Sequence, residues 1–272
     1  MSIFSNFYTK PGPGVSPDMP EKKGIKRYFE IFLRHFWDLL KVNLLYVIAS
    51  IPMFVICYIS IDFFDIFSLE SVAASNGWSD TYKILISYIS TMIVILCGSG
   101  PASGALSYIM NCISNEKGIF IWLDFKDYFQ QCFKKGMIVA AMDVLLVTIA
   151  LPLALRFYYV YYLNTANWIY FIIFLIIALA TVIYITMHIY IYPFMATMEL
   201  KLSDIFKNSL IMTLIYIPQN IALIILNSII TFMIFSSYNK AFIIIITLLC
   251  WVSFMRYPWE YFSSQKVKKI NK

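Results

Sequence analysis

Long apolar stretches separated by short polar segments make up most of this chain after residue 41. A helix of about 20 apolar residues crosses the roughly 30 Å hydrocarbon core of a bilayer, and each of these stretches is long enough to do so. The pattern therefore predicts an all-α integral membrane protein with six transmembrane helices. The predicted spans cover residues 42–64, 84–113, 136–160, 167–197, 209–236 and 241–262.

Amphipathic segments precede the first, third and fifth predicted spans. Residues 21–41 place apolar side chains on one helical face and charged side chains on the other, as in a helix that lies in the membrane interface. Residues 119–135 and the shorter segment 202–209 follow the same plan. We expect the Pro- and Gly-rich residues 1–20 to form a cytoplasmic arm, and residues 21–272 to form a single polytopic membrane domain.

These segments suggest a three-unit internal repeat, in which each unit has an interfacial helix, an outgoing span and a returning span. The stretch DLLKVNLLYVIASIP at 38–52 resembles DIFKNSLIMTLIYIP at 204–218, with Asp, Lys, Leu, Ile and Pro at matching positions. Repeats of this kind occur in transporters. The alternative is a chance similarity between short apolar helices.

Composition and charge placement add an orientation to this topology. Hydrophobic residues make up 61% of the chain and charged residues 13%, against about 25% charged residues in a soluble domain. Of the 21 Lys and Arg residues, 18 lie in segments that the topology places on one side. The positive-inside rule then predicts that both termini are cytoplasmic. Because the net charge of +6 is spread over short loops, it does not indicate a nucleic-acid partner.

The second predicted span contains the small-residue stretch GSGPASG at 98–104. Proline removes a backbone donor, so the helix should kink or break there. One interpretation is a hinge or a segment that lines a transport path. The other is a surface for close helix packing, because two of the glycines are four residues apart. The residues concerned are Gly98, Gly100, Pro101, Ser103 and Gly104.

Asp143 and His188 are the two ionisable residues well inside predicted spans. At 1.5 Å per residue, both lie roughly 10–14 Å below the cytoplasmic surface, so their side chains can face one another. Ionisable groups at such depth are costly and indicate function by default. The alternative is a neutral hydrogen-bonded pair that only joins two helices.

No motif in the sequence names a reaction. The HExxH, GxSxG, Walker A and GxGxxG patterns of common enzymes and nucleotide-binding proteins are all missing. The five cysteines are odd in number and lack CxxC spacing, which indicates free thiols instead of a disulfide framework or a metal site. We therefore expect a protein that is not an enzyme and that binds neither a cofactor nor a metal. The cysteines are Cys57, Cys97, Cys112, Cys132 and Cys250.

The first 130 residues contain five short motifs in a defined order: KPGPGV at 10–15, EKKGIKRYFE at 21–30, FWDLLKVNLL at 36–45, GPA at 100–102 and WLDF at 122–125. Together they resemble the YesL-like family of bacterial membrane proteins, a family defined by a domain of unknown function. The resemblance implies a multi-pass protein of the bacterial cell membrane. Because such proteins are often encoded beside sugar-importing ABC transporters, it also implies a link to carbohydrate transport.

Two functions follow as expectations. The first is an accessory or assembly component of an ABC importer, whose partners are the lipid bilayer and the sugar permease subunits. The second is a self-contained secondary transporter or channel for a small solute, in which the interrupted second span and the Asp143/His188 pair line the path. A homo-oligomer is compatible with both.

Overall fold

The computed structural model describes residues 24–66, 100–146, 150, 153–154, 157–158, 161, 168–235 and 245–270. Within these residues the chain is 92% helical and contains no strand, which confirms the predicted all-α class. The main elements are α2 (Ile25–Arg34), α3 (Phe36–Ile66), α6 (Pro101–Ser114), α7 (Ile121–Leu145), α9 (Trp168–Thr197), α10 (Leu202–Ile215), α11 (Ile217–Phe235), the π-helical turn η2 (Thr247–Trp251) and α13 (Val252–Ile270).

Two of the described helices are long and apolar enough to cross a membrane. They are α9 and residues 217–234 of α11, and most of their surface is exposed. Exposed apolar surface of this extent is more compatible with lipid than with water, so it supports a membrane location. The six spans, the orientation and the cytoplasmic termini stay predictions.

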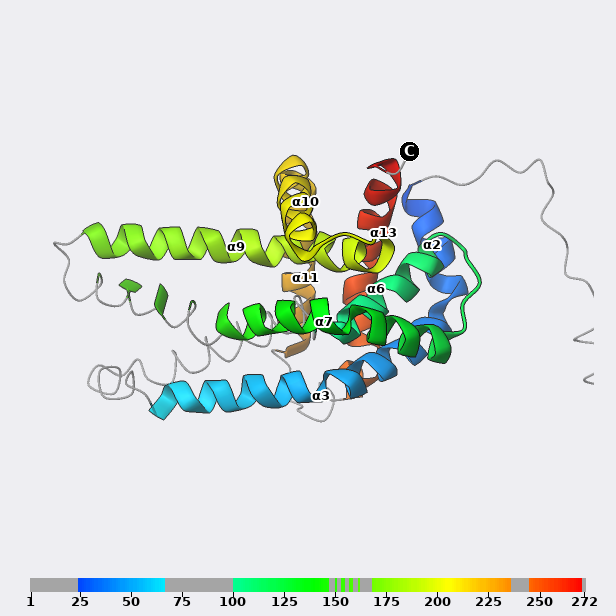
Figure 1. The fold of residues 1–272 in the computed structure, drawn as a ribbon, viewed down its shortest axis with the longest axis horizontal. Coiled ribbons are helices and arrows are strands. Elements are labelled where there is room, and N and C mark those ends of the chain that lie inside the picture. Colours follow the sequence, from blue (N-terminus) through cyan, green and yellow to red (C-terminus); the bar gives the residue numbers. More distant parts are fainter. Residues whose placement is uncertain are drawn as a thin grey trace, which may run out of the picture.

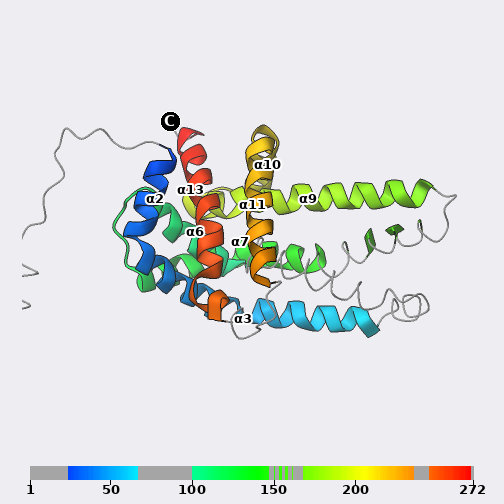
Figure 2. The same cartoon turned by 180° about the vertical axis from the view of Figure 1, so that it is seen from behind.

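The helices form two sets with different directions (Figures 1 and 2). In both views α3, α7 and α9 run along the long axis of the molecule, whereas α11 and α13 run across it. The two sets meet where α6, the start of α3 and the end of α9 gather beside α13 (Figure 1). Since helices in one flat bilayer are tilted from its normal by about 0–40°, this arrangement differs from a bundle of six similar spans.

The buried apolar residues form two clusters near this meeting point. One joins α2, α3, α6 and α13 around Leu39, Leu106 and Tyr257. The other joins α7, α9 and α10 around Val139, Tyr190 and Ile205. Along α9 the buried residues lie almost entirely in the second half, from Thr186 to Ala196, so the packed core lies at that end of the helix.

Helix boundaries differ from the prediction at two places in the middle of the chain. Residues 119–135 and 136–160 were expected to be separate elements, but α7 runs without a break from Ile121 to Leu145. Predicted span five is instead divided at Tyr216, between α10 and α11. Pro218 favours a division here, because its ring clashes with the carbonyl four residues earlier in a straight helix, although Pro52 and Pro193 lie inside continuous helices. Asn220 bridges the break by donating to the Thr213 carbonyl at 3.2 Å.

The two segments proposed as an internal repeat have different local structures at their matching prolines. Pro52 lies inside the continuous helix α3. Pro218 follows the break at Tyr216, in the first turn of α11. The predicted interfacial helix at 21–41 is likewise divided at His35, since α2 ends at Arg34 and α3 begins at Phe36. The repeat stays a prediction.

Helices α6 and α7 form a tight antiparallel hairpin with contacts at every fourth residue. Gly100 faces Gly136, and one turn later Gly104 faces Cys132. After another turn the rings of Tyr108 and Tyr128 stack with their centroids 3.3 Å apart. Gly100 has a φ of +57°, which glycine adopts without strain, and α6 begins directly after it. The small residues therefore allow close packing at the start of α6.

A methyl group at position 136 tests this packing. In Gly136→Ala the new Cβ would lie 2.6 Å from the Pro101 backbone nitrogen, which cannot rotate away. We expect a loss of about 1–3 kcal/mol in the free energy of unfolding, although alanine favours a helix interior over glycine by roughly 0.5–1 kcal/mol. Thermal unfolding in detergent measures the change. Gly118→Ala is the control, because its Cβ meets nothing within 4 Å. Equal unfolding temperatures for both variants would contradict close packing of α6 against α7 at Gly136.

Candidate functional site

The side chains of Asp143 and His188 lie in contact inside the protein. Asp143 comes from the end of α7 and His188 from the second half of α9. The His188 Nε2 atom lies 3.0 Å from Asp143 Oδ1, as an ion-pair contact and not as an aligned hydrogen bond. The Tyr184 hydroxyl donates to the same Asp143 oxygen at 2.7 Å. Both members of the pair are buried.

A second buried pair, Arg256 and Glu260, lies on α13. One turn of helix separates the two residues, and Arg256 Nη2 lies 3.5 Å from Glu260 Oε1. The Ser107 hydroxyl of α6 donates to the other Glu260 oxygen at 2.7 Å. Within the described part of the chain, Nε and Nη1 of Arg256 have no hydrogen-bond partner. The guanidinium therefore keeps two donors that no described residue uses.

Aromatic rings connect the two pairs. The Arg256 Cζ atom lies 5.2 Å from the centre of the Tyr192 ring and 6.0 Å from that of Tyr46. The centroid of the Tyr192 ring also lies 5.6 Å from the centroid of the His188 imidazole. These distances are within the range of cation–π contacts. We call Asp143, His188, Arg256 and Glu260 the buried polar centre; none of the four is more than 3% exposed.

The spacing of residues along α9 explains why this helix contributes to both pairs. Tyr184, His188 and Tyr192 are four residues apart, so they lie on one helical face. The face turns toward α7 at Asp143 and toward α13 at Arg256. Tyr184, His188 and Tyr192 therefore form a polar stripe on α9 that faces both α7 and α13.

The small-residue stretch of the second predicted span lies next to this centre only in part. Gly98 is outside the described residues. Gly100, Pro101 and Gly104 pack against α7, as described above. Ser103 is buried and its hydroxyl lies 3.3 Å from the Tyr46 hydroxyl, beside the Arg256 guanidinium. The stretch therefore serves close packing and also positions one polar group near the centre.

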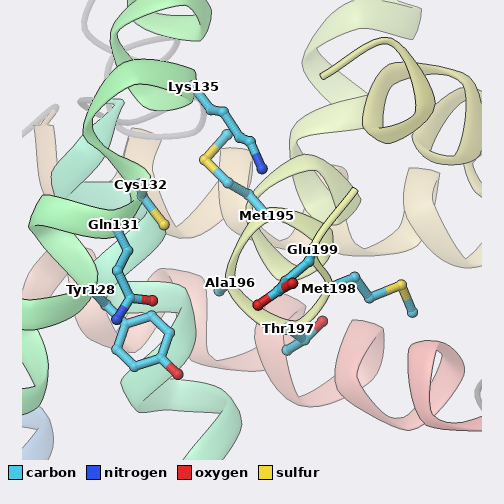
Figure 3. A pocket seen from close by; sticks show the side chains of 9 residues that line it. All are labelled: Tyr128, Gln131, Cys132, Lys135, Met195, Ala196, Thr197, Met198 and Glu199. Carbon is cyan, nitrogen blue, oxygen red and sulfur yellow. The ribbon is translucent and has the colours of Figure 1, made fainter. Parts of the chain in front are cut away.

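A polar pocket of about 320 Å³ opens between α7 and the end of α9 (Figure 3). From α7, the Lys135 ammonium reaches across and donates to the Leu200 carbonyl at 2.9 Å. Cys132 forms part of the wall, and its burial raises the pKa of the thiol to about 11. A thiol with this pKa stays protonated at neutral pH and is a poor nucleophile. The lining residues are Tyr128, Gln131, Cys132, Lys135, Met195, Ala196, Thr197, Met198 and Glu199.

The described residues contain no group of three or more His, Cys, Asp or Glu side chains that could hold a metal ion. Of the five cysteines, Cys112, Cys132 and Cys250 are free thiols. Cys97 and the side chain of Cys57 lie outside the described part of the structure. Expecting no metal or cofactor stays a prediction.

Sequence reasoning missed Arg256 and Glu260, which it had placed at the cytoplasmic end of the sixth span. The sequence does contain a feature that indicates a buried pair. In the segment RYPWEY at 256–261, an Arg and a Glu one helical turn apart are surrounded by aromatic residues. Such a pair on an aromatic helix can bury both charges together. The basic residue was counted only as a topology marker.

A comparison with known proteins finds no matching family model, no matching curated protein and no matching solved structure. The resemblance to the YesL-like family therefore rests on the motifs quoted above, and the function rests on the geometry of the chain itself.

Removing the Glu260 charge from α13 tests whether Arg256 and Glu260 stabilise each other. In Glu260→Gln the buried Arg256 loses its counter-ion, and leaving an unpaired buried charge costs about 3–5 kcal/mol. The double variant Arg256→Met, Glu260→Leu replaces both ions with apolar side chains and should be more stable than Glu260→Gln. Thermal unfolding in detergent gives the order of stability of these variants. If the double variant loses as much as both single substitutions added together, the two side chains do not interact.

Proposed function

We propose that this chain is a multi-pass protein of the bacterial cell membrane that moves a small polar solute on its own, as a secondary transporter. The proposal includes cytoplasmic N- and C-termini and no catalytic role. The observation that carries it is the buried polar centre: four ionisable side chains from three helices, none of them more than 3% exposed, in a chain that is 61% hydrophobic.

The reason is the cost of holding charge away from water. In a membrane protein such groups almost always face a bundle interior or a water-filled cavity, and they mark ion or substrate pathways. A purely structural pair needs no free donors, yet Arg256 Nε and Nη1 have no hydrogen-bond partner in the described residues. These two donors can bind an acceptor group of a solute. The rings of Tyr46 and Tyr192 lie near the guanidinium, and they suit a polar solute that also has an apolar face.

The polar pocket supplies an entrance in this proposal. Ala196 lines the pocket and lies one helical turn beyond Tyr192, on the polar stripe of α9. From Ala196 to His188 the stripe covers eight residues, or about 12 Å of helix. Lys135 and Glu199 at the pocket place one cation and one anion at its rim. A solute entering here would meet the Arg256 guanidinium before the Asp143/His188 pair.

Uptake into liposomes that contain only this protein tests the proposal. Labelled glucose, maltose and glycine serve as probes, and at least one should accumulate above the level in protein-free liposomes. We expect Asp143→Asn to abolish this uptake, because the asparagine cannot carry the carboxylate charge. Asp38→Asn changes the same residue type in an exposed His–Asp pair and should leave uptake intact. If both variants transport equally, the buried polar centre has no role in transport.

A second candidate is an accessory or assembly component of a carbohydrate ABC importer, as the family resemblance implies. The observation in its favour is the two-faced structure of α2. One face packs against α13 through Tyr28, whose burial raises the pKa of its hydroxyl to about 12. An adjacent face leaves Ile25, Phe29 and Leu33 exposed. An exposed apolar helical face of this kind fits a groove on a partner protein.

The way α2 is held supports a docking role. Arg27 and Arg34 bind the same carboxylate, Glu116, at 3.4 and 2.6 Å. Glu116 has a φ of +53° at the turn after α6. The two contacts fix α2 to the α6–α7 hairpin and keep its apolar face directed outward.

Affinity purification of the tagged chain from native membranes tests this candidate. Sugar permease subunits should be recovered with the natural sequence and lost from the double variant Phe29→Asn, Leu33→Asn, because polar side chains remove the apolar face. Trp122→Asn, at an equally exposed apolar position on α7, is the matched control and should retain them. Purification without any permease subunit in several detergents would exclude this role.

A further inference from the structure

We infer that Asp143 and His188 together bind one proton, which makes H⁺ the coupling ion of the proposed transporter. The proton-binding site stands on geometry alone, whereas its use in coupling rests on the proposed function. The argument starts from the hydrogen-bonding capacity of the imidazole ring and then considers what surrounds it.

The Nδ1 atom of His188 must carry a hydrogen. It lies 3.0 Å from the backbone carbonyl oxygen of Tyr184. A carbonyl oxygen only accepts hydrogen bonds, so the ring nitrogen has to be the donor. In a neutral imidazole one nitrogen is protonated and the other has a lone pair. A neutral His188 therefore presents a bare Nε2.

The bare Nε2 would then face a carboxylate. Asp143 Oδ1 lies 3.0 Å from this nitrogen and already accepts from the Tyr184 hydroxyl. Two acceptors at this distance repel each other, and a proton on either group removes this repulsion. Either His188 is an imidazolium beside a carboxylate, or Asp143 is a carboxylic acid beside a neutral imidazole. Both forms contain the same single proton, so the proton belongs to the pair and not to either residue alone.

The surroundings let the pair hold this proton without water. On α9, Tyr184 donates to Asp143 and the Tyr192 ring lies against the imidazole. On α13, Arg256 lies beyond the Tyr192 ring and is paired with Glu260.

Among the described side chains, those of the other helices add no charge close to the pair. α6 has no charged residue, and Lys135 of α7 binds the Leu200 carbonyl two turns away from Asp143. Asp204 and Lys207 of α10 are exposed. The described charges of α3, Asp38 and Lys41, contact each other at 3.3 Å.

The protonated pair and the Arg256/Glu260 pair each have a net charge of zero when Glu260 is ionised. Release of the proton leaves one negative charge in a site that is closed to solvent. Such a charge is unfavourable unless water or a cation enters. Proton release is thereby linked to opening of the site, which is the linkage that a proton-coupled transporter requires.

The chain contains an exposed counterpart that serves as an internal control. His35 Nδ1 lies 3.0 Å from Asp38 Oδ2, the same separation as in the buried pair, but both side chains are partly exposed. His35 and His188 are the only two histidines in the sequence. Selective ¹⁵N-histidine labelling therefore gives two ring systems, and His35→Gln assigns them.

Solid-state NMR of the labelled full-length protein in liposomes is the direct test, with ¹³C-labelled Asp carboxyl groups observed in parallel. At neutral pH we expect His188 to be protonated at Nδ1, with one further proton on either Nε2 or the Asp143 carboxyl. Raising the pH should remove this proton in one step. A neutral His188 beside an ionised Asp143 at neutral pH, or a bare Nδ1, would overturn the inference.

Two variants separate the proton site from the transport proposal. Asp143→Asn should abolish the shared titration, whereas Asp38→Asn should leave the His188 signals unchanged. If Asp38→Asn changes the His188 titration as much as Asp143→Asn does, the assignment to the buried pair is wrong. The liposome uptake described above is measured separately. A normal proton site without any uptake would reject the transporter and keep the site, and uptake that drives no proton movement would reject the coupling.

Discussion

The cost of burying charge is the constraint on which the rest of this structure depends. Arg256 and Glu260 cannot both be buried unless they are close together, and Glu260 additionally needs the Ser107 hydroxyl. Asp143 and His188 impose the same condition on α7 and α9. Because Asp143 and His188 come from different helices, and Ser107 of α6 binds Glu260 of α13, these polar contacts specify which helices pack together. Apolar contacts alone would tolerate many more arrangements, since apolar side chains pack without directional requirements.

The close packing of α6 on α7 makes these contacts geometrically possible. Gly104 lies against Cys132 so tightly that a Cβ at position 104 would be 2.8 Å from the Cys132 Cβ. A larger residue would push α6 away from α7. Ser103 and Ser107, on the same helix, would then move relative to Tyr46 and Glu260. The glycines therefore act on the buried polar centre through distance, although none of them contributes a polar side chain.

Part of this picture could be predicted from the sequence, because it depends on local periodicity. Helical content follows from the apolar stretches, and the facing depth of Asp143 and His188 follows from counting residues along two neighbouring helices. The break at Tyr216 needed the geometry of Pro218, which a hydropathy pattern does not contain. Arg256 could not be separated from solvent-exposed basic residues, because its burial depends on packing against the Tyr46 and Tyr192 rings of distant helices. Long-range packing is absent from any local pattern.

The Tyr192 ring gives the two charged pairs a common neighbour, and this has a consequence for how the centre responds to a change of charge. Its centroid lies 5.6 Å from that of His188 and 5.2 Å from Arg256 Cζ. When the Asp143/His188 pair is protonated, Arg256 interacts mainly with Glu260 at 3.5 Å. An anionic Asp143/His188 pair would attract the Arg256 guanidinium past the Tyr192 ring, in competition with Glu260. The contacts of Arg256 therefore depend on the charge of a pair that it does not touch directly.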